Sequence, residues 1–328
     1  MKWYVTSIRH ECGEWCESEA SMMAYLINGW IYLLHPNLVV RFVLKLRRLP
    51  NVAVPRTAAD RFLWRKIFDR NPLFPELCDK LRAKQYVARK CPELNIPKVL
   101  WSGTDFHDIP DDVLKEPVVL KSNHASGQIA FVDHDGPDRA HLKQQTDRWL
   151  SRAYGQEKGE WGYRNIDRKI FVEELLLGPD GDHLLDVNVY VVNGRVQHVQ
   201  CMRDSYGADP NTTRYDRDGN PLEPHDSPKF TYRVVDVPDQ YPRLIELAER
   251  LGADFDHIRC DFYLVGDAIY FGELTLYALS GYPEDDSWLE KRWQRNWDLR
   301  QSWFLSTPQV GWRRTYAHWL TNRLNDRD

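Results

Sequence analysis

Two short segments near the C-terminal end place carboxylates where they could hold a metal ion. Folded as a β-hairpin about a Gly-Asp-Ala turn, the segments set Asp261 directly opposite Glu273, and Arg259 opposite Thr275. Side chains alternate between the two faces of a strand, so these four share one face. Opposed carboxylates repel each other, and a divalent cation such as Mg²⁺, held by oxygen ligands, would compensate. The alternative is a solvated face on which Arg259 neutralises both carboxylates.

The same turn fixes the rest of the hairpin register. It predicts that Val265 lies opposite Ile269, and Tyr263 opposite Phe271. The other face of the hairpin is expected to be apolar and to face the core: Cys260, Phe262, Leu264, Tyr270 and Leu274.

Lysines that could bind phosphate lie earlier in the chain. Lys121 ends the apolar run Pro-Val-Val-Leu-Lys and precedes a loop of small residues that includes Ser126 and Gly127. Backbone N–H groups of such a loop can approach an anion, although a lysine at a strand end often only extends its amine into solvent. Lys80 and Lys84 lie at the start of a predicted helix, where solubility alone would explain them.

The segment Phe-Val-Glu-Glu-Leu-Leu, residues 171–176, is a predicted strand that runs into a loop. A linker of this kind between two lobes can offer backbone N–H and C=O groups to the edge of an adenine ring. Spacing alone does not assign it that role.

The elements that must position these residues are helices alternating with short hairpins. An Asn-Gly turn at 193–194 between β-rich runs predicts one hairpin, and residues 206–232 are predicted to form a lid or binding loop. The absence of a repeating βα rhythm favours an α+β fold. Helices are predicted at 79–91, 140–154, 241–251 and 288–324, and strands at 98–101, 117–121, 127–132, 169–176, 184–192, 195–202 and 257–276.

The composition describes a folded protein of mildly acidic charge. The 328 residues hold 44 Lys and Arg against 48 Asp and Glu, a formal charge of −4, which argues against a general nucleic-acid binder. Six scattered cysteines without a CxxC pair predict reduced, mostly buried thiols and a cytoplasmic location. His10, Cys12 and Cys16 lie close in sequence, but no second ligand cluster accompanies them, so a zinc site is not expected.

The first 75 residues are expected to be mostly helical. Their apolar stretch 25–34 ends at His35-Pro36, far short of the roughly 18 residues of a membrane span, and reads as a buried or peripheral helix. The predicted organisation is a helical region at 1–75, one lobe at 76–170 and a second lobe at 171–328. The Trp-rich tail is expected to pack in the core or in an interface, which leaves a homodimer open.

Four motifs in one order resemble the ATP-grasp superfamily. These are Asp79-Lys80 opening a helix, Val-Val-Leu-Lys121 before its Ser/Gly loop, Val-Glu-Glu-Leu-Leu-Leu-Gly, and Arg-x-Asp followed after eleven residues by Glu-x-Thr. The run Asp-Lys-Leu-Arg-x-Lys is similar to that of D-alanine–D-alanine ligases. Asn71-Pro72, Leu-Lys-Ser-Asn-His-Ala-Ser-Gly and Tyr-Phe-Gly-Glu-Leu-Thr resemble the TupA-like branch, named for teichuronopeptide synthesis. The resemblance covers about residues 60–305.

The resemblance implies two α+β lobes that clasp ATP, with an N-terminal helical extension and C-terminal helices. It also implies roles for individual residues. The phosphates of ATP would be held by Lys80 and Lys121, with Ser126 and Gly127 in the loop. The adenine would be bound by Glu173, Glu174 and Leu176, the ribose by Asp186, and Mg²⁺ by Asp261, Glu273 and Thr275. Arg259 would stabilise an acyl phosphate, Arg203 would bind the substrate carboxylate, and His124 could serve as a base.

The sequence departs from the superfamily at three points. Thr275 stands where an Asn ligand is usual, Gly127 is the only glycine of its loop, and residues 1–75 show no recognisable α/β domain for the first substrate. These departures leave the acceptor site unmapped.

The implied reaction is amide formation from a carboxylate and an amine through an acyl phosphate. By resemblance the carboxylate belongs to a uronic acid of a surface polysaccharide or its precursor, and the amine to an amino acid or amino alcohol. The alternatives are an ATP-grasp-type kinase that phosphorylates a hydroxyl and a non-catalytic nucleotide-binding protein. No nucleic-acid partner and no membrane span are expected.

Overall fold

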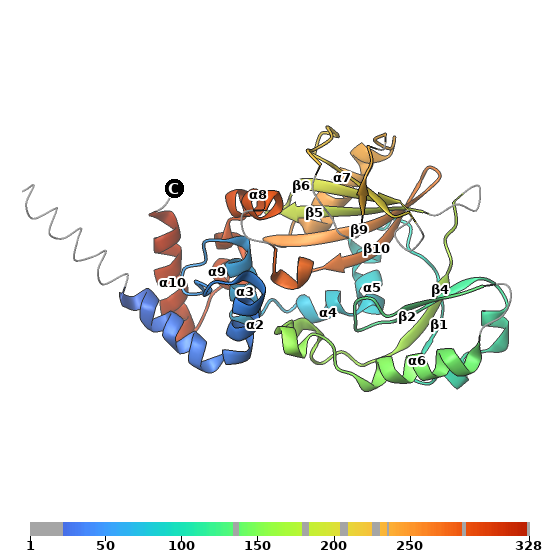
Figure 1. The fold of residues 1–328 in the computed structure, drawn as a ribbon, viewed down its shortest axis with the longest axis horizontal. Coiled ribbons are helices and arrows are strands. Elements are labelled where there is room, and N and C mark those ends of the chain that lie inside the picture. Colours follow the sequence, from blue (N-terminus) through green and yellow to red (C-terminus); the bar gives the residue numbers. More distant parts are fainter. Residues whose placement is uncertain are drawn as a thin grey trace, which may run out of the picture.

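Two β-sheets and a group of terminal helices make up the chain (Figure 1). The structure, a computed structural model, describes residues 22–133, 138–178, 184–203, 209–224, 230–234, 236–283 and 287–326. The mixture of separate helices and mainly antiparallel sheets is an α+β fold, as the sequence predicts.

The smaller sheet has four antiparallel strands in the order β1-β4-β2-β3. Helix α6 (Arg139–Ser151) lies below it in Figure 1 and buries Leu142 and Trp149 against its apolar side chains. The strands are β1 (Val99–Gly103), β2 (Val118–Ser122), β3 (Ile129–Val132) and β4 (Ile170–Glu174). The predicted boundary at residue 171 falls inside β4, which bonds to β1 and β2 and so goes with this sheet.

The larger sheet has six strands in the order β10-β9-β5-β6-β7-β8. One face is apolar and packs against α5 (Lys80–Lys90) and α7 (Tyr241–Gly252), which share its hydrophobic core. The strands are β5 (Leu185–Val192), β6 (Arg195–Arg203), β7 (Asn211–Tyr215), β8 (Thr231–Tyr232), β9 (His257–Val265) and β10 (Ala268–Thr275). The opposite face of β5, β9 and β10 carries the polar residues of the candidate site.

Local chemistry explains most of these elements. Asn193 and Gly194, both with positive φ, form the predicted tight turn between β5 and β6. The loop prediction for 206–232 is wrong at 211–215, because Asn-Thr-Thr-Arg-Tyr forms β7 and pairs with β6. Two threonines and a tyrosine favour a strand, and the flanking Asp, Asn and Pro residues obscured that signal.

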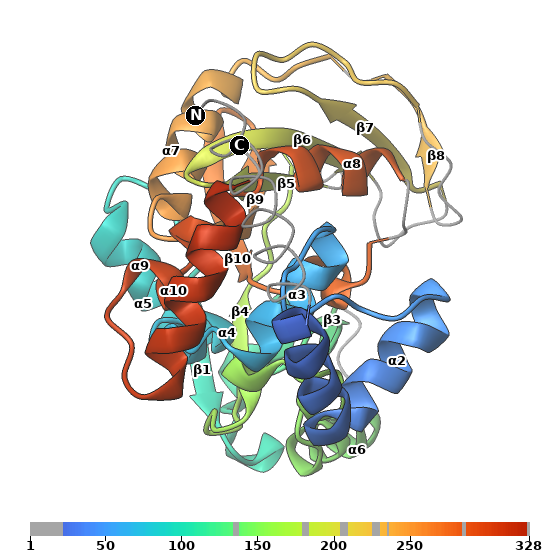
Figure 2. The ribbon, with the colours of Figure 1, turned by 90° about the vertical axis from the view of Figure 1, so that its left-hand side faces the viewer.

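The terminal helices pack together into one helical unit (Figure 2). A helix over residues 22–34, α2 (Pro36–Leu46) and α3 (Ala58–Ile67) share a core with the C-terminal α9 (Trp303–Ser306) and α10 (Trp312–Asn325). Trp64 donates to the hydroxyl of Tyr316 over 2.9 Å, which in turn donates to the backbone of Ala53. The described N-terminal helices and the C-terminal helices α9 and α10 therefore share one core.

The buried guanidinium of Arg65 ties the helical unit to the hairpin of β9 and β10. It donates to the carbonyls of His257, at the start of β9, and Leu276, just after β10, over 2.9 and 2.7 Å. It also pairs with Asp256 at 2.5 Å, and Asp256 accepts a second hydrogen bond from Trp297. One cation thus fixes the two ends of the hairpin that carries Asp261 and Glu273.

Within the described residues the cysteines are buried as expected, whereas the tryptophans of the tail are divided, with Trp312 66% exposed. Cys78, Cys91, Cys201 and Cys260 are unpaired and buried, whereas the sequence stretch with His10, Cys12 and Cys16 lies outside them. Trp293 and Trp297 of the tail are buried beside α3, in and just after α8 (Trp288–Asn296).

We predict that Arg65→Met strongly destabilises the protein, because Asp256 would be left as an unpaired buried charge. Breaking a buried pair in this way costs about 3–5 kcal/mol, whereas an exposed pair contributes about 0–1 kcal/mol. Arg89, which pairs with Glu76 on the surface, provides the matched control Arg89→Met. Urea unfolding followed by circular dichroism measures both, and equal midpoints for the two variants would contradict the role assigned to Arg65.

Candidate nucleotide and metal site

A β-bulge brings the two carboxylates of the hairpin face to face. Near the turn, Ile269 pairs with Leu264 and Phe271 with Phe262, one position away from the predicted register. The register shifts between Phe271 and Glu273, and beyond that point Asp261 lies opposite Glu273 and Arg259 opposite Thr275, as predicted. The predicted pairs near the turn are wrong because the turn has two residues instead of three. The extra residue of the bulge shifts the register by one position, so the pairs beyond it agree with the prediction.

Gly272 is the residue that allows this bulge. A Cβ added there would lie 3.0 Å from the backbone oxygen of Asp261, closer than real side chains normally come. The bulge also turns Tyr270, predicted to face the core, onto the face of Tyr263, its cross-strand partner. Glycine at this position therefore permits the close approach of β10 to β9 beside the carboxylates.

Arg259 neutralises Asp261 in the structure. Its Nε and NH2 donate to the two carboxylate oxygens over 2.7 and 2.6 Å, and NH2 also reaches Oγ1 of Thr275 over 3.1 Å. Burial raises the pKa of Asp261 to about 6 against the lowering effect of Arg259, and Glu273 and Asp186 raise it further. The face thus holds more negative charge than one guanidinium offsets.

Lys80 joins this face to the smaller sheet. Its Nζ lies 3.6 Å from Glu273 and donates to the carbonyl of Ala125 over 2.6 Å. Its backbone N–H donates to Asn123, in the loop between β2 and β3, over 2.9 Å. Asp79 caps α5 by accepting from Leu81 N, so the helix begins with Lys80 held beside both sheets.

Lys121 and Lys84 share the buried carboxylate of Glu173. Lys121 contacts Glu173 directly, and Lys84 Nζ lies 3.0 Å from its other oxygen. Burial would raise the pKa of Glu173, but the two lysines together hold it below its ordinary value. Lys84, interpreted from sequence as a solubility residue, is only 8% exposed and also donates to the carbonyl of Pro97. Lys121 Nζ further lies 6.0 Å from the ring centroid of Tyr263 on β9.

The loop after Lys121 has a buried base and an exposed tip. Ser126 and Gly127 are exposed, and Gly127 has a φ of +74° with nothing within 4 Å of an added Cβ. His124 is buried, its ring nitrogens lying 3.3 Å from Asn123 Oδ1 and 3.2 Å from the carbonyl of Trp149. Burial lowers the pKa of His124, and both of its ring nitrogens lie against protein groups.

The chain that leaves β4 crosses from the smaller sheet toward the larger one. Glu174 accepts from the backbone N–H of Lys98 over 2.8 Å, and Leu176 is half-buried two residues later. Asp186, on β5, lies opposite Tyr263 of β9 and so shares the polar face of the larger sheet.

Asn188 is not predicted as a site residue but lies in the site, and Arg203 is predicted but lies away from it. Asn188 lies directly opposite Asp261, on the other side from Glu273, so an amide joins the two carboxylates in one cross-strand row. Its position in an alternating strand was the only available signal. Arg203 is exposed at the end of β6. Its neighbour Met202 lies opposite Asp186 and therefore shares the polar face, so Arg203 lies on the other face of the sheet, away from the candidate site.

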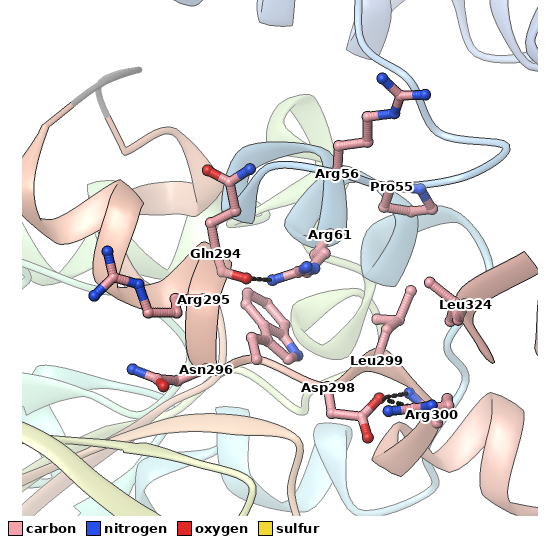
Figure 3. Close-up of a pocket in the computed structure, with 11 residues that line it drawn as sticks. Pro55, Arg56, Arg61, Gln294, Arg295, Asn296, Asp298, Leu299, Arg300 and Leu324 are labelled. Carbon is pink, nitrogen blue, oxygen red and sulfur yellow. Dashed lines mark hydrogen bonds and ion pairs between the residues drawn. The ribbon is translucent and has the colours of Figure 1, made fainter. Parts of the chain in front are cut away.

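A separate cavity of about 620 Å³ in the helical unit is lined by four arginines, but their guanidinium groups do not converge (Figure 3). Arg300 pairs with Asp298 at 2.8 Å, and Arg61 donates to the carbonyl of Gln294 over 2.9 Å. Arg56 and Arg295 point away from each other in Figure 3. This cavity lacks the opposed carboxylates and the paired lysines of the site between the sheets.

A family model described as TupA-like ATP-grasp matches residues 60–291. The chain belongs to the TupA-like ATP-grasp family. Arg65, Lys80, Lys121, Asp261 and Glu273 all lie within the matched residues.

The chain is also similar to solved ATP-grasp structures at low identity, and no curated protein matches it. D-alanine–D-alanine ligase from Bacillus anthracis complexed with ATP is 14% identical with a TM-score of 0.36, and the match covers 61% of this chain and 55% of the ligase. D-alanyl-alanine synthetase A from Vibrio cholerae O1 biovar eltor is 14% identical with a TM-score of 0.39, covering 76% and 66%. A RimK domain ATP-grasp protein from Sphaerobacter thermophilus is 17% identical with a TM-score of 0.35, covering 68% and 64%. The chain thus spans about half the length of the Bacillus ligase.

The donor set of the candidate site fits a hard cation. The carboxylates of Asp261 and Glu273, the hydroxyl of Thr275 and the amide oxygen of Asn188 are oxygen ligands, the kind that Mg²⁺ selects. Within the described part of the chain no group of three or more His, Cys, Asp or Glu side chains is arranged to hold a metal. A Mg²⁺ ion held by Asp261 and Glu273 would need further oxygen ligands, which substrate phosphates typically supply.

We predict that Asn188→Asp destabilises the protein in EDTA and that Mg²⁺ alone restores most of the loss. A third carboxylate in the row adds like-charge repulsion between strands, and a divalent cation relieves it. Melting temperatures with EDTA and with Mg²⁺ measure the effect, and Asn322→Asp on the exposed side of α10 is the matched control. A variant that melts like wild type in EDTA, or that Mg²⁺ does not rescue, would contradict this site.

Proposed function

We propose that the chain is an ATP-dependent carboxylate–amine ligase that forms an amide through an acyl phosphate. We further propose a uronic acid of a surface polysaccharide or its precursor as the carboxylate substrate, and an amino acid or amino alcohol as the amine. The observation that carries the proposal is the junction of Lys80 with Glu273 at 3.6 Å, opposite Asp261, in a chain of the TupA-like ATP-grasp family. It supports the proposal because a lysine that could bind phosphate lies beside a carboxylate pair that could bind a metal ion, between the two sheets.

Lys80 and Lys121 each contact a carboxylate, which ATP phosphates could replace. Lys121 is held by Glu173, which Lys84 also neutralises. Lys121 can therefore turn to the phosphates of ATP without leaving Glu173 as an unpaired buried charge, since Lys84 remains. Lys80 would meet the phosphates from the side of β10, and the exposed backbone of Ser126 and Gly127 would cover them.

The adenine would lie against the chain that follows β4. Because Glu173 is occupied by two lysines, its carboxylate is proposed to order them, while the backbone of Glu174 and Leu176 reads the base. Asp186, on the polar face of β5, is proposed to contact the ribose.

Mg²⁺ would be held by Asp261 and Glu273, with Thr275 and Asn188 beside them. When bound, it would neutralise charge on the phosphate oxygens. Arg259 pairs with Asp261 and is proposed to move part of its hydrogen bonding to the substrate as negative charge develops there.

In the proposed reaction a substrate carboxylate oxygen attacks the γ-phosphorus of ATP, and ADP leaves. The amine then attacks the acyl carbon, phosphate leaves, and an amide forms. His124 is not assigned as the base, since it is buried with both ring nitrogens engaged. Arg203 is not assigned to the substrate, because it lies on the other face of the sheet. Catalysis would come mainly from positioning and from preorganised positive charge.

We predict that hydroxylamine, with ATP, Mg²⁺ and uronic acids as carboxylates, gives a hydroxamate together with ADP. An acyl phosphate reacts with hydroxylamine, whereas a sugar phosphate made by a kinase does not. Arg259→Met should lower the rate by about 10²–10³, the usual effect of removing one charge stabiliser, and Arg203→Met should leave it unchanged within about twofold. ADP release with a phosphorylated sugar and no hydroxamate would favour the kinase instead, and equal losses in the two arginine variants would contradict the assigned site.

A further inference from the structure

The helix over residues 22–34 exposes an apolar face to solvent. It contains no Asp, Glu, Lys or Arg, and it lies at one end of the molecule, away from both sheets (Figure 1). Tyr25, Trp30 and Leu33 are 78%, 63% and 76% exposed. Met22, Met23, Leu26 and Leu34 are the other large apolar side chains exposed on this helix.

The opposite face of this helix packs against the helical unit. Ile31 is buried in its core, Ala24 and Ile27 pack against that core, and Asn28 accepts hydrogen bonds from the backbone N–H groups of Val52 and Ala53. Apart from Asn28 the helix is apolar on both faces, and a helix of that kind normally lies inside a protein or in a membrane, yet this one lies on the surface. Thirteen residues extend about 20 Å, short of the roughly 30 Å of a bilayer core. None of the described helices is long and apolar enough to cross a membrane.

Helix α2, which follows directly in the chain, also exposes apolar side chains and adds positive charge. Val40 and Leu44 are exposed, and Lys45 and Arg47 beside them are exposed cations. Residues 22–50 contain four basic residues and no acidic one, in a chain whose net charge is −4. Arg48 pairs with Asp60 of α3, so the exposed positive charge is that of the end of α2.

We propose that the helix over residues 22–34 and α2 form a docking surface for an anionic lipid bilayer. The apolar side chains would enter the boundary between headgroups and acyl chains, Trp30 and Tyr25 would lie at the headgroup level, and Lys45 and Arg47 would contact anionic headgroups. A second copy of the chain fits this surface less well. A two-fold dimer would pair this surface with itself. The basic residues at the end of each α2 would then enter an interface to which residues 22–50 contribute no acidic side chain.

The test is co-sedimentation of the full chain with vesicles of phosphatidylcholine, with and without phosphatidylglycerol. We expect binding to the anionic vesicles and much weaker binding to the neutral ones. Leu26→Glu/Leu33→Glu should lower binding at least tenfold, because the wild-type leucines gain free energy when they move from water into the bilayer and the glutamates do not. Lys45→Ala should lower binding to anionic vesicles about fivefold and leave neutral vesicles unaffected.

Val310→Glu is the matched control, since Val310 is 80% exposed on another part of the helical unit, and it should bind like wild type. Circular dichroism melts show that the variants fold. Wild-type protein that stays in the supernatant with anionic vesicles would overturn the proposal, as would equal losses in Leu26→Glu/Leu33→Glu and Val310→Glu. A dimer that the Leu26→Glu/Leu33→Glu variant dissociates, without vesicle binding, would assign the surface to a second copy and also overturn it.

Discussion

The opposition of Asp261 and Glu273 across β9 and β10 is the constraint on which the account of this protein depends. Two carboxylates in cross-strand register weaken a sheet, and the bulge at Gly272 brings them into that register when a regular hairpin would not. Arg259 and Lys80 offset the charge in the structure. In the proposed function, Arg259 and Lys80 would exchange these carboxylate contacts for contacts with substrate and phosphate.

The rest of the fold holds that hairpin in place from three sides. Its apolar face packs on α5 and α7, Arg65 clamps its two ends to the helical unit, and Lys80 connects its edge to the loop of the smaller sheet. Membership in the TupA-like ATP-grasp family and this geometry are consistent with each other, since a site between two lobes needs groups from both. On the side of the smaller sheet, Lys84 and Lys121 pair with Glu173, and we propose that they contribute to that site.

The sequence predicts the local elements well and the long-range pairings poorly. The turn at Asn193-Gly194 and the strands around Lys121 follow from short patterns, because turn chemistry and alternation act over a few residues. The opposition of Asp261 and Glu273 is also predicted, but from a three-residue turn, whereas the structure reaches it through a two-residue turn and a bulge. The burial of Lys84 and the position of Asn188 do not, because each depends on a strand from elsewhere in the chain. Similarly, nothing near Arg65 in the sequence indicates that it would bond to residues about 190 and 210 positions away.

The most direct test of the central claim is thermal melting with and without Mg·ATP on wild type, Lys121→Ala and Asp261→Asn. At a hundred times the dissociation constant a ligand adds about 2.7 kcal/mol of stability, a shift of several degrees. We expect this shift for wild type and its loss or strong reduction in both variants. No shift for wild type at millimolar ATP, or equal shifts in all three proteins, would contradict it.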